Sequence, residues 1–144
     1  MPTGYVYNYS PDLNIVLVNG IPLTGFGEDE AISVAPMADL STSKVGIDGD
    51  VSRSMGTDRR VEVTIRLMQT SPSNDVLSGI VGVQAVTGGR LITLTVMNAT
   101  SRDLVVAGQA WLRARPTLTF AREAGEREWV FQCLPSAWFA GGSL

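Results

Sequence analysis

The chain of 144 residues contains no histidine, one cysteine and almost no lysine. Without histidine, a serine or cysteine nucleophile has no imidazole base and a metal has no imidazole ligand. The single cysteine, Cys133, excludes an internal disulfide, and its apolar neighbours Phe131 and Leu134 favour a buried thiol over a nucleophile. Lys44 lies in a polar segment, whereas a Schiff-base lysine needs an apolar pocket. These absences disfavour an enzyme.

Charge is also scarce. Charged residues make up 17% of the chain, below the roughly 25% usual in soluble domains. The net charge is −3, and the arginines form no basic stripe of the kind that grips phosphates. With 44% hydrophobic residues the chain can fill the core of one domain. We therefore expect weak affinity for DNA and a surface that is largely buried against other copies.

The sequence also lacks long apolar runs. No stretch approaches the roughly 20 residues that cross a bilayer, and the N-terminal residues 1–12 lack the basic and apolar regions of a signal peptide. We therefore expect no membrane partner, and synthesis and assembly in a reducing cytoplasm.

Two-residue alternation of apolar and polar side chains is the dominant pattern, and it predicts strands with one buried face. It is clearest over residues 60–68 and returns over 91–97 and 126–134. Residues 104–112 are apolar on both faces, as is part of 126–134, which predicts burial on both sides. Shorter strands are expected over residues 13–18, 21–26, 32–34 and 117–120, with an Asn19-Gly20 hairpin turn between the first two and the last paired to the strand around Trp129.

One helix is predicted over residues 71–84. Ser71 is a suitable N-cap, and Pro72 fits the first turn, where a missing N–H costs nothing. An apolar stripe at helical spacing would pack on a sheet, formed by Val76, Leu77, Ile80 and Val81. The sequence thus indicates a mainly β protein with one flanking helix.

Residues 39–60 form a long polar segment, rich in Ser, Thr, Gly and Asp, with strand-like pieces at 44–47 and 50–54. A segment of this length is unusual in a compact domain unless it has a function, so we interpret it as a hairpin or loop arm that extends beyond the core. Asp48, Asp50 and Asp58 could hold a hard cation. The further oxygen ligands of a calcium loop are missing, so a solvated turn or intersubunit salt bridges are the preferred interpretation, and no metal is expected.

Two further groups of residues are candidates for binding a cofactor or a protein surface. The glycine pairs at 88–89 and 141–142 lack the Lys-Ser/Thr of a phosphate-binding loop, so no cofactor is expected. Trp138 and Phe139 are large apolar residues close to the last residue of the sequence, where chains are usually mobile. They are expected to dock, either on the parent domain or on a neighbouring molecule.

The stretch 69–77, QTSPSNDVL, is similar to a motif of the tail tube proteins of contractile-tailed bacteriophages. The pieces YSPD at 9–12, GFG at 25–27, VGIDG at 45–49 and SRS at 52–54 resemble the same family in order and spacing. The resemblance covers most of the chain and is strongest over residues 10–80. None of these pieces is a catalytic signature, so their specificity comes from their joint occurrence.

The resemblance implies one tail-tube domain over residues 1–144, an antiparallel β-sandwich or small barrel flanked by a helix, with an architecture shared by type VI secretion tubes. Hexameric rings of the chain would stack into the hollow inner tube of the tail, the channel for DNA ejection. The implied partners are other copies, the sheath, baseplate and tail terminator proteins, with the tape measure protein and DNA held transiently in the channel. The protein would belong to the virion tail.

On this interpretation the arm reaches a neighbouring ring, and six copies of charge −3 give a ring of about −18 that does not bind its cargo. Which sheet face lines the channel is left open. The expected intersubunit residues are Asp48, Asp50, Arg53, Arg59, Arg60, Trp138 and Phe139, and the expected channel-lining residues are Glu62, Thr64, Arg66, Thr93 and Thr95.

Two alternatives stay open. A secreted or baseplate-associated β-sandwich binding module would recognise a sugar or a protein, and it predicts a monomer or trimer with an exposed aromatic groove. A small hydrolase that uses paired carboxylates is the third hypothesis, although no substrate-stacking aromatic residues accompany the carboxylates.

Overall fold

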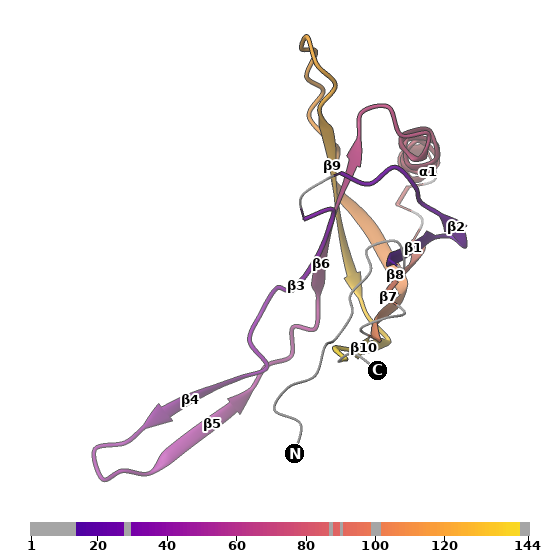
Figure 1. The fold of residues 1–144 in the computed structure, drawn as a ribbon. Coiled ribbons are helices and arrows are strands. Elements are labelled where there is room, and N and C mark those ends of the chain that lie inside the picture. The colour runs from indigo at the N-terminus through magenta and orange to yellow at the C-terminus, as the bar shows by residue number, and fades with distance from the viewer. Residues whose placement is uncertain (1–13, 28–29, 87, 90, 99–101, 142–144) are drawn as a thin grey trace, which may run out of the picture.

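The computed structural model describes residues 14–27, 30–86, 88–89, 91–98 and 102–141. The described part of the chain is mainly β, with one helix (Figure 1). The strands are β1 (Asn14–Val18), β2 (Ile21–Pro22), β3 (Ile32–Pro36), β4 (Ser41–Val45), β5 (Val51–Met55), β6 (Val61–Met68), β7 (Ile92–Asn98), β8 (Asp103–Ala114), β9 (Glu126–Leu134) and β10 (Ala137–Phe139), and the helix is α1 (Ser73–Val86).

Eight of these strands form one antiparallel sheet in the order β2-β1-β7-β8-β9-β6-β3. The eighth strand, β10, pairs with the first half of β8, while β9 pairs with the second half. Residues 135–136 separate β9 from β10, so the chain bends there and β10 continues along the same side of β8. The remaining strands, β4 and β5, pair with each other outside this sheet.

The sheet is strongly curved. Val34 of β3 and Val96 of β7 are separated by three strands in the sheet order, yet both line one groove. The concave side holds the core, and Leu77 and Val81 of α1 pack into it. Both ends of the sheet contribute buried side chains, including Val16 and Val18 of β1, Val63 and Ile65 of β6, and Trp129 and Phe131 of β9. This architecture confirms the expected fold class, a mainly β antiparallel protein with one flanking helix.

The alternating strands are confirmed. In β6 the residues Val61, Val63, Ile65 and Leu67 are at most 4% exposed, and the intervening side chains are half-buried. In β9 the predicted burial of both faces is also confirmed, because Val130 is 6% exposed between two buried neighbours of the core face.

The first hairpin has the predicted turn, but its return strand is shorter than expected. Asn19 and Gly20 have φ angles of 52° and 80°, as the turn requires. The return strand β2 ends at Pro22, which lies on the sheet edge where proline is tolerated. The extension to Phe26 was wrong, because the chain crosses to the other end of the sheet and Phe26 bridges Leu67 of β6.

The strand predicted over residues 117–120 was wrong. Trp129 already pairs with Ile65 of β6 on one side of β9, and β8 occupies the other side as far as Ala114. Pro116 follows two residues later, and a proline cannot donate the next ladder hydrogen bond. Residues 115–125 therefore form a loop between β8 and β9 that projects beyond the sheet (Figure 1).

The helix begins as its sequence predicts and ends at Val86. The Ser71 hydroxyl accepts a hydrogen bond from the Ser73 backbone N–H at 3.2 Å, as an N-cap does, with Pro72 in the first turn. Asn74 is 5% exposed, and its side-chain amide donates to the backbone carbonyls of Met68 and Ser71. Its Oδ1 accepts from Trp129 Nε1 at 3.0 Å, which fixes the helix to β9.

The segments 25–27 and 69–77, which both resemble tail tube proteins in sequence, meet at the start of α1. Gly25 has a φ of +73°, and a Cβ at this position would lie 2.6 Å from the Ser71 side chain. Ser71 Oγ donates to the Thr24 carbonyl, and the Thr24 N–H donates to Ser73 Oγ at 2.8 Å. The 25–27 and 69–77 segments therefore depend on each other for the close approach of the crossing chain to α1.

Candidate interaction surfaces

The hairpin of β4 and β5 extends well away from the sheet and forms the arm expected over residues 39–60 (Figure 1). Cross-strand pairing places all the apolar side chains of the two strands, Val45, Val51 and Met55, on one face together with Arg53, Ser41 and Ser43, and we call it the apolar face. The two valines and Met55 are each more than half exposed, and Ile47 at the tip is fully exposed. The opposite face carries Thr42, Ser52, Ser54 and Lys44. The apolar face therefore carries three large apolar side chains beside Arg53 and two serines, and the other face is hydroxyl-rich.

Asp48 and Asp50 lie in the tight turn at the tip of the arm. The turn closes through hydrogen bonds from the Gly46 N–H to the Asp50 carbonyl at 2.7 Å and from the Gly49 N–H to the Gly46 carbonyl. Asp58 lies at the other end of the arm, so it does not join the two tip carboxylates. Among the residues that the structure describes, no three His, Cys, Asp or Glu side chains come together as a metal site.

Asp58 and Arg60 form an ion pair at the root of the arm. Arg60 Nη2 lies 2.9 Å from Asp58 Oδ2, and Arg60 Nε donates to Asp58 Oδ1 at 3.0 Å. The side-chain hydrogen bonds from Arg60 are the main cause that lowers the pKa of Asp58 to about 2. Nearby, the Gly56 N–H donates to the Leu40 carbonyl at 2.8 Å and closes the hairpin.

Three of the predicted intersubunit residues come together beside this ion pair. Arg59, Arg60 and Trp138 line a groove of about 320 Å³, which we call the arm-root groove. Trp138 belongs to β10 and reaches this groove because β10 pairs with β8 and follows β9 after the bend at residues 135–136. The other residues that line the groove are Pro36, Ala38, Leu40, Asp58, Val61 and Pro135.

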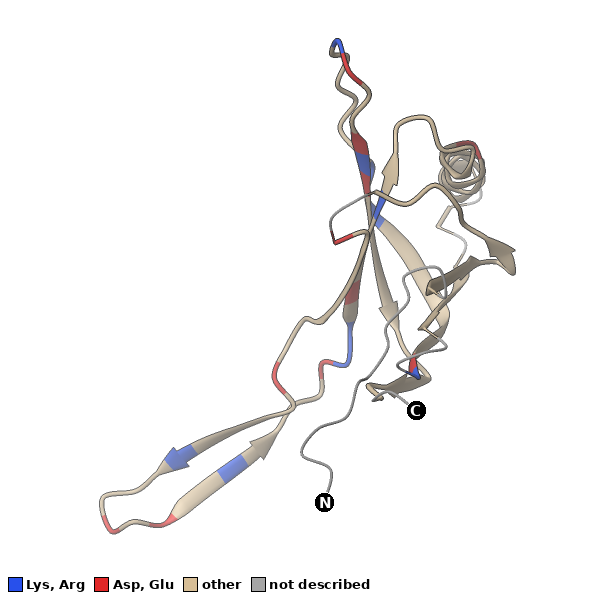
Figure 2. Ribbon diagram, in the orientation of Figure 1, with Lys and Arg blue, Asp and Glu red and all other residues tan. Residues whose placement is uncertain are grey.

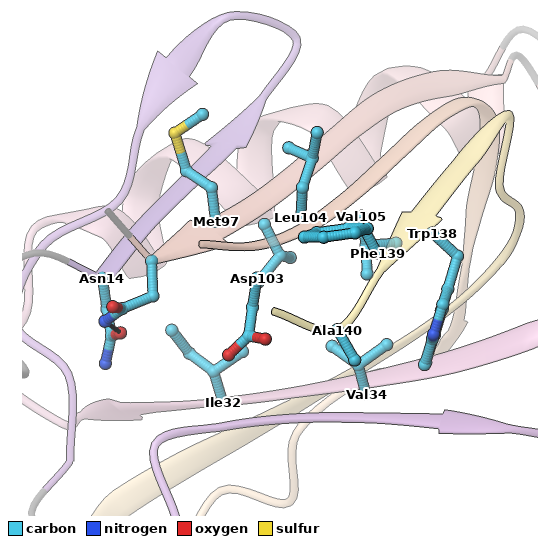
Figure 3. A pocket seen from close by; sticks show the side chains of 12 residues that line it. Asn14, Ile32, Val34, Met97, Asp103, Leu104, Val105, Trp138, Phe139 and Ala140 are labelled. Carbon is cyan, nitrogen blue, oxygen red and sulfur yellow. Dashed lines mark hydrogen bonds between the residues drawn. The ribbon is translucent and has the colours of Figure 1, made fainter. Parts of the chain in front are cut away.

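A second groove, of about 350 Å³, lies between β3 and β10 and contains both Trp138 and Phe139 (Figure 3). Ile32 and Val34 of β3 both line this groove; in Figure 3 Val34 lies near Ala140, and Ile32 lies nearer Asp103. Trp138 and Phe139 are 45% and 55% exposed. The expected docking of the two aromatic residues on the parent domain is therefore only partial, and large parts of both side chains stay uncovered.

Glu62, Thr64 and Arg66 share the non-core face of β6 and form one patch with residues of β9 and β8, which we call the polar face. Arg66 Nε lies 3.3 Å from Glu128, and Arg113 Nη1 lies 3.8 Å from Glu62. The Trp111 Nε1–H donates to Gln132 Oε1 at 3.2 Å. Both arginines of this patch are thus paired with carboxylates.

Thr93 and Thr95 point away from the core on β7, but β8 and β9 separate them from β6. Because the sheet curves, the structure does not bring these two threonines into the patch of Glu62, Thr64 and Arg66. Thr93 instead contacts the first hairpin, where its N–H donates to Asn19 Oδ1 at 2.9 Å. Register alone could have identified the patch partners Glu128 and Gln132, since alternation gives the faces and antiparallel pairing gives the neighbours. Arg113 lies at the register shift between Leu112 and Ala114, which alternation does not predict.

The exposed face of α1 is almost free of charge. Asp75 in the first turn is the only charged residue of the helix. Val83 and Val86 are 52% and 87% exposed. A Cβ built at Gly79 or Gly82 meets no atom within 4 Å, so neither glycine is required by packing within the molecule. Within the described residues no helix is both long and apolar enough to cross a membrane.

The sequence is similar to those of known phage proteins. A family model described as the tail tube protein of bacteriophage PhiTE matches residues 15–136. The chain is 28% identical, over 148 aligned positions, to structural protein ORF10 of Pseudomonas phage KPP10, and the match covers 97% of this chain and 86% of that protein.

Solved structures with a similar fold come from contractile injection systems. The sheath/tube terminator of the PVC extracellular contractile injection system has a TM-score of 0.61 at 12% identity, covering 90% of this chain and 95% of that chain. The PVC sheath-tube complex gives a TM-score of 0.60 at 12% identity, with 94% and 93% covered. The cap of the anti-feeding prophage gives 0.59 at 11%, with 92% and 91% covered.

The family match spans most of the chain, and the homologue is a structural protein of a phage. The similar folds come from a sheath/tube terminator, a sheath-tube complex and a tube terminating cap. The chain therefore belongs to the phage tail tube protein family and is a structural component of a phage tail.

Proposed function

We propose that the whole chain acts as one tail-tube domain, and that six copies form a ring. The rings stack into the inner tube of a contractile tail, through which DNA leaves the virion. A sheath surrounds this tube, baseplate and terminator proteins close its two ends, and the tape measure protein occupies the channel before ejection. Assembly takes place in the host cytoplasm, and the protein performs no catalytic step.

The observation that carries this proposal is the unsupported arm. In the described part of the chain, β4 and β5 pair only with each other, and an isolated two-stranded hairpin is marginally stable in water. Its exposed apolar side chains, Val45, Val51 and Met55, need a surface to cover them. Since the arm extends beyond the sheet of its own molecule, another copy is the surface that we propose.

Three charged residues of the arm are proposed to orient this contact. Arg53 lies in the middle of the apolar face, and the carboxylates of Asp48 and Asp50 flank the tip. Arg59, Arg60, Trp138 and Phe139 complete the intersubunit surface at the root of the arm and on β10. A mixed surface of this kind has an apolar centre with charges that fix the register of the partner.

The polar face of β6 is the proposed channel wall. Its arginines, Arg66 and Arg113, are paired with carboxylates, so this face presents no free row of cations to phosphate. Glu62 and Thr64 complete the patch. We also keep Thr93 and Thr95 as candidate wall residues, at a second position on β7.

The helix is proposed to face the sheath. It packs on the core side of the sheet, which is opposite to the polar face. If the polar face of β6 lines the channel, α1 lies on the outside of the tube. Its uncharged exposed face then suits burial against another protein.

Replacement of the arm tests the proposal. Leu40 and Gly56 are joined by a backbone hydrogen bond, so a two-residue Asn-Gly turn can replace residues 41–55 without changing the root. The shortened protein is expected to keep its circular dichroism spectrum and its cooperative unfolding but to form no tubes in electron micrographs. The matched control keeps the arm and replaces Lys44 by Ser on the hydroxyl-rich face, and it should still polymerise. Long tubes of the shortened protein would refute the proposed role of the arm.

A further inference from the structure

The loop of residues 115–125 carries an exposed aromatic side chain. Phe120 is 83% exposed, whereas Leu118 of the same loop lines a cavity beside α1 and Trp129. Leu118, itself 56% exposed, therefore faces its own molecule in part, while Phe120 is the more exposed of the two. An exposed phenylalanine at the end of a projecting loop suits insertion into an apolar groove of a partner.

The arm-root groove offers such a site on the same chain. It combines the indole of Trp138 with two prolines, Pro36 and Pro135, and the side chains of Ala38 and Leu40. Its volume of about 320 Å³ is sufficient for one aromatic ring. Aromatic and apolar groups that enclose a single anchoring side chain are typical of the centre of a protein interface.

The loop and the groove lie at opposite ends of β9. The loop ends where β9 begins, at Glu126, and the groove residue Pro135 directly follows the last residue of β9. Nine residues of strand span about 30 Å. Phe120 therefore cannot reach the groove of its own molecule, and only another copy in a head-to-tail arrangement can bring the two together.

The charges around the loop and the groove are complementary. In the groove, Arg60 is paired with Asp58, and Arg59 forms no ion pair with any described residue. On the loop, Glu123 is exposed and likewise has no ion-pair partner within the described ranges. Figure 2 shows acidic and basic positions close together near the end of this loop. Glu123 can thus approach Arg59 when Phe120 enters the groove.

We propose that Phe120 of one copy inserts into the arm-root groove of a second copy of this chain, with Glu123 beside Arg59. The inference rests on the proposed stacking of rings and identifies one of its contacts. Because the two surfaces differ, the contact is heterologous, and between stacked rings a heterologous contact can repeat without closing, as a growing tube requires.

A cysteine pair tests the contact. The variants Phe120→Cys and Ala38→Cys are made separately and together; the native Cys133 is buried, and burial raises the pKa of its thiol, so it stays unreactive. After mild oxidation, a mixture of the two single variants should yield a mixed dimer, and the double variant should yield a ladder of higher multimers. Each single variant alone should stay monomeric on a denaturing gel.

Charge reversal provides the second readout. Glu123→Arg and Arg59→Glu should each raise the critical concentration for tube formation about tenfold, and the double reversal should restore it. Arg122→Glu, at the neighbouring loop position, is the matched control and should change the critical concentration less than threefold. Two results together would overturn the Phe120 contact alone. The cysteine variants would form tubes without cross-linking, and the charge-reversed variants would form tubes at an unchanged critical concentration. Wild-type protein that forms no tubes would overturn the proposed function together with this contact.

Discussion

At the scale of single residues, Asn74 explains why the 69–77 segment is recognisable. Its amide satisfies three backbone carbonyls before and within the first helical turn, and its carbonyl oxygen accepts the indole N–H of Trp129. Both side chains are at least 95% buried. A buried polar group that loses its partner costs about 1 to 3 kcal/mol, so this residue links the start of α1 to β9 more strongly than an apolar contact would.

Asn74→Ala should lower the free energy of unfolding by about 2 to 4 kcal/mol, because it leaves the indole N–H and several carbonyls buried without partners. Urea denaturation followed by tryptophan fluorescence measures this change. Ser78→Ala, an exposed substitution in the same helix, is the control and should stay within about 0.5 kcal/mol of wild type. Equal stability of the two variants would contradict the structural role of Asn74.

The Asp58–Arg60 pair predicts a pH dependence at the root of the arm. The pKa of Asp58 is lowered from 3.8 to about 2, so the stabilisation that it provides is complete above about pH 4 and is lost as the pH falls through about 2. Because the pair is solvent-exposed, this contribution is small. The titration of the Asp58 carboxyl carbon, followed by NMR, should have its midpoint near pH 2.

In the Arg60→Gln variant this midpoint should rise toward 3.8, because the hydrogen bonds that lower the pKa are lost. Arg59→Gln, at the adjacent position, should leave the midpoint of Asp58 unchanged. A midpoint that does not move in Arg60→Gln would show that Arg60 does not hold the carboxylate.

At the scale of elements, substitutions on the exposed face of α1 distinguish effects on folding stability from effects on assembly. Glycine in a helix costs about 1 kcal/mol relative to alanine, and neither Gly79 nor Gly82 is needed for packing within the molecule. Gly79→Ala and Gly82→Ala should therefore raise the free energy of unfolding by up to about 1 kcal/mol each. Thermal unfolding checks this gain.

Lysine has a helix propensity close to that of alanine, so Gly82→Lys should fold as stably as Gly82→Ala. It adds a bulky charge to a face that we propose is buried against the sheath. A co-sedimentation assay with purified sheath protein should therefore show tube formation by both variants and sheath binding only by the alanine variant. Sheath binding by the lysine variant would place the sheath contact elsewhere.

Elements with strict periodicity could be predicted from the sequence, and elements set by distant contacts could not. The alternation of β6 and the cap at Ser71 depend on adjacent residues, and both are as predicted. In the arm, the first strand Ser41–Val45 begins before the expected piece 44–47, and the second strand Val51–Met55 lies one residue beyond the expected piece 50–54. Their register is set by the turn with Gly49 at a φ of +91°, and a hairpin without a buried face has no hydrophobic pattern to fix it.

At the scale of the whole molecule, the curvature of the sheet decides which exposed residues share a patch, and the sequence does not reveal this curvature. Alternation placed Glu62, Thr64, Arg66, Thr93 and Thr95 on the non-core side, but only the curved sheet shows that β7 and β6 carry separate patches. The arm-root groove could not be predicted from the sequence either, because the pairing of β10 with β8 is what brings Trp138 to the same groove as Arg59.

The channel wall can be tested by adding charge. Thr64→Lys adds six cations to each ring at the proposed wall, so DNA should associate with assembled tubes in a salt-dependent manner. Co-sedimentation of labelled DNA at increasing ionic strength measures this association, and wild-type tubes should show almost none. Thr93→Lys is the matched variant on β7, and its DNA binding shows whether the wall extends to that strand. Tubes of Thr64→Lys that do not bind DNA would place β6 outside the channel.

The central claim is that the exposed surface of this chain is covered by further copies of itself. Cryo-electron microscopy of the purified full-length protein at high concentration tests this claim most directly. We predict hollow tubes built from stacked six-fold rings, with the β4–β5 arm of each copy in contact with another copy. A solution of dispersed monomers at the same concentration, with no rings or tubes in the images, would contradict it.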